Sequence, residues 1–198
     1  MSDSWMETCL VSIAAQSGTD IPFQSLTETV DVDLGEKDIE GVALVNGGRM
    51  TKFTPEGDTS ITLEAYPLEA GSGDISSATA GAGFYDLLQA EDTTQPLAIT
   101  NTTARSKYRM AILWTDDTAA TNAAGALSSS NNKGFRITGA NGYITSVKPS
   151  FTDGVLKFTI AFKVAAFTKA GNSQILVEST DGTATLTALQ SYTSSTRW

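Results

Sequence analysis

Carboxylates are the side chains of this sequence that could carry chemistry, because its 198 residues include no histidine and one cysteine. The absence of histidine excludes Ser-His-Asp and Cys-His nucleophilic catalysis, and it excludes histidine-containing zinc sites. The lone Cys9 excludes an intrachain disulfide framework and a cysteine-based zinc site. Two possibilities remain, namely glycoside hydrolysis by paired acids and metal binding by oxygen ligands.

Two pairs of adjacent acids, Asp116 with Asp117 and Glu91 with Asp92, are candidates for glycoside hydrolysis. In such an enzyme the two carboxyl groups flank the scissile bond and one of them has a raised pKa. The first pair lies in a polar loop and the second at the end of a predicted helix. Acids in such places are ordinarily solvated surface groups. We therefore predict no catalytic residues and no enzymatic activity.

The segment DVDLGEKD, residues 31–38, faintly echoes a calcium-binding loop, because three aspartates surround Gly35. It lacks a third closely spaced oxygen ligand before the glycine and the bidentate glutamate that such a loop requires. The glycines of GAGFYD lack the third glycine of a dinucleotide-binding loop. We expect neither a metal nor another cofactor.

The charge balance excludes a nucleic-acid-binding protein of the usual basic kind. The chain has 13 Lys and Arg residues against 22 Asp and Glu residues, a net charge of −9 that repels phosphate. With 40% hydrophobic and 18% charged residues it has the composition of a folded globular chain. The first 18 residues show neither the basic start nor the apolar run of a leader or membrane span. We expect a single domain over residues 1–198.

Alternation of apolar and polar residues predicts several half-buried strands. The clearest is DGVLKFTIAFKVAAF, residues 153–167, in which Lys157, Thr159 and Lys163 separate apolar residues. The predicted core residues of this strand are Leu156, Phe158, Ile160, Phe162 and Val164. The stretches TETVDVDL and TSITLEAYPL alternate in the same way. In contrast, YRMAILWTDD is apolar on both faces and predicts a central strand covered on both sides.

Glycine-containing turn signals and two polar segments complete the predicted order of elements. Hairpins are expected at Asn46-Gly47-Gly48 and at Asn141-Gly142. SQILVEST and ATLTAL predict the last two strands, and AGFYDLLQAED predicts a short helix. Residues 70–83 and 118–133 are rich in small polar residues and predict flexible segments. The tally is about nine or ten strands and one helix.

Two blocks of the sequence, residues 38–71 and 142–172, resemble the tail tube proteins of tailed viruses, most closely those of archaeal tailed viruses. The first block resembles that family's hairpin, Pro-Glu turn and following strand, and the second resembles its late hairpin and long alternating strand after a Thr-Asp-Gly turn. The resemblance implies a mainly β fold, a β-sandwich or rolled antiparallel sheet with one short flanking α-helix.

The resemblance also implies a structural virion protein. Such a protein is made in the host cytoplasm and forms hexameric rings that stack into the hollow tail tube. Its partners are further copies of itself, other tail proteins and the double-stranded DNA that passes through the lumen without specific binding, with no membrane involved. Strand number agrees, because about 16 to 18 strands are needed to enclose even an aqueous channel, so several chains must pool their strands.

Site residues follow as hypotheses from this expectation. Acids and hydroxyls lining a lumen would let DNA slide past. The candidate lumen-facing residues are Thr29, Asp31, Asp33, Thr62 and Glu64. Their alternation shows which side chains share a face but not where that face points, so outer solvent is the alternative. Trp5 and Trp198, near the two ends of the sequence, are candidate contacts between subunits.

Three other classes of protein share the many short strands and the abundance of Ser and Thr. They are a capsid decoration protein, a surface adhesion module or lectin-like β-sandwich, and a carbohydrate-active enzyme on such a sandwich. Oligomeric size separates these classes from a tube protein, because they predict monomers or trimers instead of rings.

Overall fold

The computed structural model describes residues 8–15, 21–25, 29–35, 39–45, 47–53, 57–65, 107–190 and 192. Ten strands and no helix occur in these ranges, which confirms the mainly β, antiparallel fold. The helix predicted around residues 81–92 lies outside them. The strands are β1 (Thr8–Ala15), β2 (Ile21–Ser25), β3 (Val30–Asp33), β4 (Ile39–Ala43), β5 (Arg49–Phe53), β6 (Thr59–Ala65), β7 (Tyr108–Thr115), β8 (Lys133–Thr152), β9 (Val155–Val164) and β10 (Ile175–Asp181).

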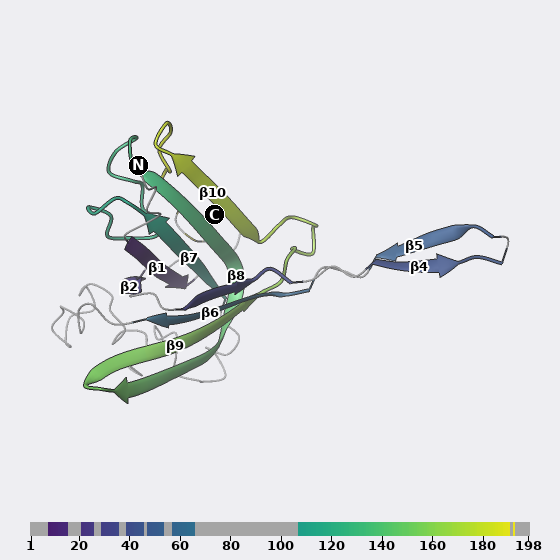
Figure 1. Ribbon diagram of the computed structural model, residues 1–198, viewed down its shortest axis with the longest axis horizontal. Coiled ribbons are helices and arrows are strands. Elements are labelled where there is room, and N and C mark those ends of the chain that lie inside the picture. The colour runs from purple at the N-terminus through teal and green to yellow at the C-terminus, as the bar shows by residue number, and fades with distance from the viewer. Residues whose placement is uncertain are drawn as a thin grey trace.

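The main sheet folds over into two layers that share one long strand, β8 (Figure 1). Residues 134–142 of β8 pair with β7, and β10 pairs with residues 133–139 on the other side. Together with β1 and β2 these strands form the β7 layer. Residues 143–152 of β8 pair with β9, which continues through β6 to β3 and forms the β9 layer. All of these pairings are antiparallel.

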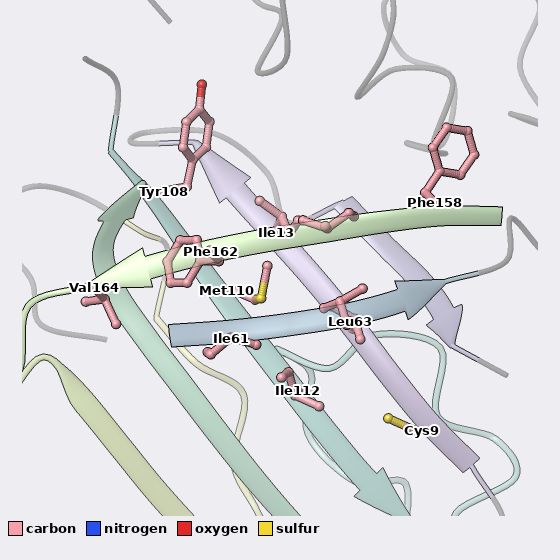
Figure 2. Close-up of a cluster of buried hydrophobic side chains, with 12 residues drawn as sticks. Cys9, Ile13, Ile61, Leu63, Tyr108, Met110, Ile112, Phe158, Phe162 and Val164 are labelled. Atoms are coloured by element: carbon pink, nitrogen blue, oxygen red, sulfur yellow. The ribbon is translucent and has the colours of Figure 1, made fainter. Parts of the chain in front are cut away.

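The main core lies between the two layers. Figure 2 shows β6 and β9 lying across β1 and β7, with their apolar side chains in between. Phe158, Ile160, Phe162 and Val164 of the predicted core strand are all buried here. Burying one such side chain contributes roughly 1.5–3 kcal/mol. The other buried members of this cluster are Cys9, Val11, Ile13, Ile61, Leu63, Tyr108, Met110 and Ile112.

A second cluster covers the opposite face of the β7 layer, so β7 is covered on both sides as its apolar run predicted. Leu10 and Leu113 on the strands pack there with Leu127 of the loop after β7 and Leu186 of the segment after β10. We expected residues 184–189, ATLTAL, to form a strand, which is wrong. The amide of Leu189 donates to the carbonyl of Ala124 at 2.8 Å, so the backbone of this segment bonds to a loop and not to a strand.

The hairpin expected at Asn141 is also wrong, because β8 runs through this position without turning back. Asn141 does adopt a positive φ of 56°, and the register opposite it shifts between Tyr108 and Met110. The positive φ therefore produces a bulge that bends the strand from one layer into the other. The true turn follows at Asp153 and Gly154, which have φ of 54° and 79° and join β8 to β9.

The hairpin expected around residues 46–48 is confirmed. β4 and β5 pair antiparallel, and Gly47 has a φ of 77° in the turn between them. The two strands form a separate sheet that lies well away from both layers (Figure 1). Within the described residues no further strand pairs with this hairpin. An isolated two-stranded hairpin is marginally stable at best in water.

Candidate functional site

The five candidate lumen residues lie on one face of two neighbouring strands in the β9 layer. Asp31 of β3 is directly opposite Thr62 of β6, and the amide of Glu64 donates to the carbonyl of Thr29 at 3.1 Å. Thr29, Asp31, Asp33 and Thr62 are exposed and Glu64 is half-buried. The residues between them turn toward the core. We call the outward side of the β9 layer its polar face.

The polar face continues across β9 and β8, where its charge changes sign. Directly opposite residues of an antiparallel pair share a face. Lys157 and Lys163 alternate with the buried residues of β9, and Lys148 of β8 is opposite Thr159. Glu64 Oε2 lies 3.9 Å from Lys157 Nζ, a partly exposed ion pair that contributes at most about 1 kcal/mol. Sequence reasoning identified these lysines as polar but could not place them beside the acids.

Both margins of the β9 layer are open within the described residues. On one side β3 pairs only with β6, and on the other residues 143–152 of β8 pair only with β9. An open margin presents a row of unpaired backbone donors and acceptors, which favours pairing with another strand. The arrangement can therefore add strands on either side without disturbing its own core.

The β4–β5 hairpin is a second exposed surface, and it carries apolar residues. Val45 at its turn is fully exposed, and Leu44 beside it is about half exposed. Ile39 and Met50 along the two strands are likewise more than half exposed. Met50 is opposite Val42 and so shares a face with Leu44, whereas Ile39 lies on the other face of the hairpin. Large exposed apolar side chains gathered on one small element make the hairpin a candidate interaction site. Sequence reasoning found the hairpin but assigned it no role, although the run VALV was a usable signal.

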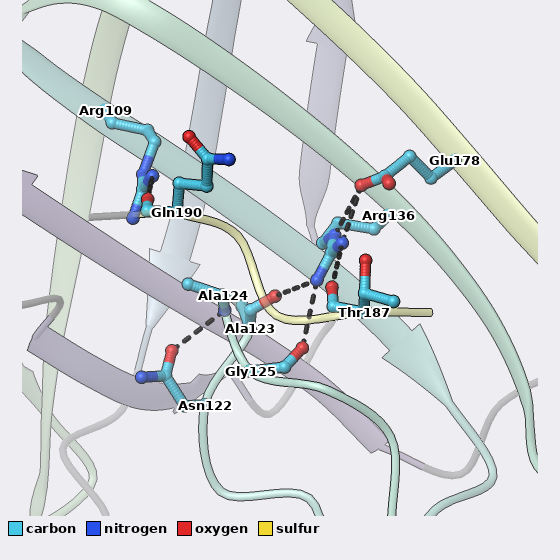
Figure 3. A network of polar contacts seen from close by, with 9 residues as sticks. All are labelled: Arg109, Asn122, Ala123, Ala124, Gly125, Arg136, Glu178, Thr187 and Gln190. Atoms are coloured by element: carbon cyan, nitrogen blue, oxygen red, sulfur yellow. Dashed lines mark hydrogen bonds and ion pairs between the residues drawn. The ribbon is translucent and has the colours of Figure 1, made fainter. Parts of the chain in front are cut away.

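Arg136 holds together the outer covering of the β7 layer, that is, the loop between β7 and β8 and the segment after β10, which lie on the face away from the main core (Figure 3). Its guanidinium is fully buried, and its Nη2 lies 2.7 Å from Glu178 Oε2 of β10. Nη1 donates to the carbonyl of Gly125 at 3.0 Å, and Nη2 donates to that of Thr187 at 2.8 Å. One side chain thus ties a loop, a strand and the segment after β10 together. No sequence signal distinguished this arginine.

Asp117 corrects the expectation that the Asp116-Asp117 pair is solvated, because Asp117 is 3% exposed. The amide and the hydroxyl of Ser128 donate to it at 2.6 and 2.8 Å, and the amide of Ala119 donates at 3.0 Å. Burial raises the pKa of Asp117, but these hydrogen bonds lower it further, so it lies below its ordinary value. Asp117 therefore organises the loop between β7 and β8.

That loop includes the segment 118–133, for which the sequence showed no apolar period. Ala123, Ala124 and Leu127 are nevertheless buried, and Asn122 Oδ1 accepts a hydrogen bond from the amide of Ala124 at 2.8 Å. The loop consists of short turns held by such local bonds, which carry no periodic pattern. Its small residues let it lie close against the β7 layer.

The remaining candidate residues either lie outside the described residues or have no reactive group exposed. Trp5, Trp198 and the segment 70–83 lie outside the described residues. Cys9 is buried in β1, and burial raises its pKa to about 12, so its thiol stays protonated at neutral pH. Within the described ranges no three acids or cysteines gather into a possible metal site. Nor does any described segment form a helix with the length and apolar content needed to cross a bilayer.

Solved structures that resemble the fold of this chain include components of an extracellular contractile injection system and Hcp proteins. The sheath/tube terminator of an extracellular contractile injection system, PVC, in its extended state has a TM-score of 0.42 and 14% identity, over 85% of this chain and 92% of that one. The sheath-tube complex of the same system gives a TM-score of 0.40 and 14% identity, over 86% and 88%. The Hcp1 protein of E. coli EAEC 042 gives a TM-score of 0.36 and 10% identity, over 87% and 97%. No protein-family model and no curated protein matches the sequence.

Proposed function

We propose that this chain is the structural subunit of a viral tail tube. Copies of it form hexameric rings, and the rings stack into a hollow tube through which the genome leaves the virion. The observation that carries the proposal is the β9 layer, which has a covered core face, a polar outer face and two open margins. Strands of neighbouring copies pair with those margins and so satisfy their unpaired backbone donors and acceptors. The edges that would otherwise favour aggregation thereby join the subunits of the ring.

The number of strands agrees with a channel of this kind. The β9 layer has four strands, so six copies joined margin to margin give a barrel of 24 strands. Barrels of about 8 strands are filled by their own side chains, whereas barrels of about 16 to 18 enclose a water-filled channel. A single chain cannot enclose a lumen for duplex DNA, but a ring of six can.

In this ring the polar face lines the lumen, with Thr29, Asp31, Asp33, Thr62 and Glu64 among its residues. One face of each β9 layer is already packed against its core, which leaves the polar face for the bore. Acids and hydroxyls repel or only weakly hold phosphate. The lysines of the same face lie on β9 and β8, and the acids of β3 and β6 separate them from the lysines of the next copy, so DNA meets no uninterrupted basic track around the ring.

The β4–β5 hairpin supplies contacts between rings. It lies apart from both layers and exposes Leu44 and Val45 at its end, and it has no further strand to support it in the described part of the chain. A copy in the next ring can cover these side chains and stabilise the hairpin. Trp5 and Trp198 are further candidates for contacts between subunits.

The viral assignment, and its archaeal affiliation, is supported by the resemblance of residues 38–71 and 142–172 to tail tube proteins. An injection-system tube is the closest alternative, since it requires the same rings and the same lumen. Both alternatives place the chain in a tail-like tube and assign it no catalytic role.

Negative-stain microscopy and mass photometry of the purified chain test the proposal. We expect six-membered rings with an open centre, and stacked tubes at higher protein concentration. A population of monomers or trimers at all concentrations would contradict it. In that case glycan-array binding would separate a lectin-like protein from a capsid decoration protein, because only the lectin binds glycans.

A further inference from the structure

The charges of the polar face are separated by strand, and this separation follows the open margins. β3, at one margin, presents Asp31 and Asp33, both exposed. The other margin, formed by residues 143–152 of β8, presents exposed Lys148. The remaining charged residues of the face, Glu64, Lys157 and Lys163, lie on the two inner strands. Each copy thus has an acidic margin and a basic one.

We propose that β3 of one copy pairs with residues 143–152 of β8 in the next copy, and that Asp31 and Asp33 face Lys148 across this junction. The inference rests on the proposed tube function and specifies how its rings close. The partner is a second copy of the same chain, and it is selected by opposite charge at the two margins.

Strand direction is compatible with this junction. β3 is antiparallel to β6, β6 to β9, and β9 to β8, so β3 runs opposite to residues 143–152 of β8. A copy added by rotation about the ring axis keeps its strand directions. Its β8 then lies antiparallel to β3 of its neighbour, and the pattern of the sheet continues across the junction.

Continued from one copy to the next without a shift, the rows of the layer place Asp31 one row from Lys148 and Asp33 two rows from it. Across the layer, Thr159 of β9 is opposite both Glu64 and Lys148, and Asp31 lies in the next outward-facing row, opposite Thr62. Diagonal neighbours on one face of a sheet are about 7–8 Å apart, within reach of a long lysine side chain. Strands of a barrel are also tilted, which shifts the rows between copies.

The same charges disfavour the wrong junctions. Two β3 margins brought together would place four carboxylates on one face, and like charges opposite each other are destabilising. Only the acidic margin against the basic margin avoids this, and that head-to-tail contact closes into a ring when repeated by rotation. The charges of the two margins therefore select the head-to-tail contact over contacts between two like margins.

Charge reversal with a mixing test separates this inference from the tube function itself. Three samples are compared with the wild type, namely D31K/D33K, K148E and an equimolar mixture of the two. Each variant alone has two margins of like charge, and we expect its ring fraction at low salt to fall by roughly tenfold or more. In the mixture every junction can again join opposite charges, in rings that alternate the two variants. Ring formation should return to within about twofold of wild type.

Lys169→Glu serves as the control, because it makes the same charge change on an exposed lysine outside the sheet. It should leave ring formation unchanged. Circular dichroism checks that the variants are folded. If the wild type forms rings and the single variants form them equally well, or if the mixture does not recover, the charge pairing is wrong while the tube function stands. If the wild type forms no rings, both proposals fail.

Discussion

The hydroxyl of Tyr192 donates a hydrogen bond to Oδ1 of Asn141 at 2.8 Å, which joins the last described residue to the bend of β8. Tyr192 is fully buried, and Asn141 holds the positive φ that directs β8 from one layer into the other. The segment after β10 therefore reaches back to the point on which the two-layer arrangement depends. This contact links residues that are 51 positions apart.

Tyr192→Phe tests that contact. Removing the hydroxyl leaves the side chain of Asn141 without this donor, and we expect the free energy of unfolding to fall by about 1–2 kcal/mol in urea denaturation. Tyr143→Phe is the control, because Tyr143 is 40% exposed and should lose less than about 0.5 kcal/mol. Equal effects of the two substitutions would show that the Tyr192 contact contributes nothing specific.

Gly142 lies next to the bend, and its lack of a side chain is required there. A Cβ at this position would lie 2.2 Å from Cζ of Phe162 and 2.7 Å from the carbonyl oxygen of Lys163. Gly142→Ala should therefore destabilise the protein by roughly 3 kcal/mol. Gly41→Ala, at a strand position with nothing within 4 Å of the added Cβ, should change stability by less than about 1 kcal/mol. Thermal or urea unfolding measures both, and similar losses would contradict the packing argument.

Substitution of Arg136 should lower the free energy of unfolding more than most substitutions in the outer covering of the β7 layer. Arg136→Met removes the buried guanidinium that contacts Glu178 and the carbonyls of Gly125 and Thr187. We expect a loss of roughly 3–5 kcal/mol in urea denaturation. Glu178→Gln keeps a hydrogen-bond acceptor at the same place and should cost less. A larger loss for Glu178→Gln would contradict the view that Arg136 holds the loop and the segment after β10 together.

Asp117 should make stability sensitive to acid. Its pKa in the folded chain lies below the ordinary value of 3.8, so the folded state holds the ionised form more strongly than the unfolded state does. The corresponding stabilisation is complete above the unfolded value and is lost as the pH falls through the folded-state pKa. Asp117→Asn should flatten the decline in unfolding free energy measured between about pH 5 and pH 2.

Asp181 provides the comparison for that measurement. Hydrogen bonds from Thr183 lower its pKa as well, but it is an exposed side chain at the end of β10, where solvent screens its interactions. Asp181→Asn should therefore change the acid decline less than Asp117→Asn does. The reverse order would show that the loop bonds of Asp117 do not contribute to stability.

Val45→Asp tests the hairpin as a contact between rings. Because Val45 is fully exposed, the midpoint of thermal unfolding should stay within about 2 °C of the wild type. A charge at this tip would be costly to bury against the next ring, so tubes in negative stain should become shorter while single rings persist. Val177→Asp is the control, because the side chain of Val177 on β10 is half exposed and lies away from the hairpin. It should leave tube length unchanged. Tubes of wild-type length in Val45→Asp would exclude the tip from stacking.

Alternation and continuous apolar runs were sufficient to predict several strands correctly. The alternating residues of β3 and β6 and the buried run of β7 all have the burial that their patterns indicate. The bend of β8 was missed because a bulge and a hairpin turn both require a positive φ, and Asn-Gly supplies it in either case. The pattern of residues 184–189 predicts a strand, but their backbone bonds with Ala124 and Leu127 belong to a distant loop, which no local pattern contains.

The candidate site was predictable in part for a similar reason. Period-two alternation places Asp31 and Asp33 on one face from the sequence alone. Their position relative to Lys148 depends on the pairing of β6 with β9, whose partner residues are 93 to 105 positions apart in the sequence. The burial of Asp117 and Arg136 likewise comes from contacts between separate segments, and no local pattern contains that information.

The length of β8 has a mechanical consequence for the proposed tube. Its 20 residues, at about 3.3 Å each, give a contour of roughly 65 Å that belongs to both layers. A force applied to the β7 layer near Lys133 is transmitted to the β9 layer near Thr152 through the covalent bonds of one strand. In the proposed tube this strand couples the outer and inner surfaces without relying on the compressibility of the side chains packed between the two layers.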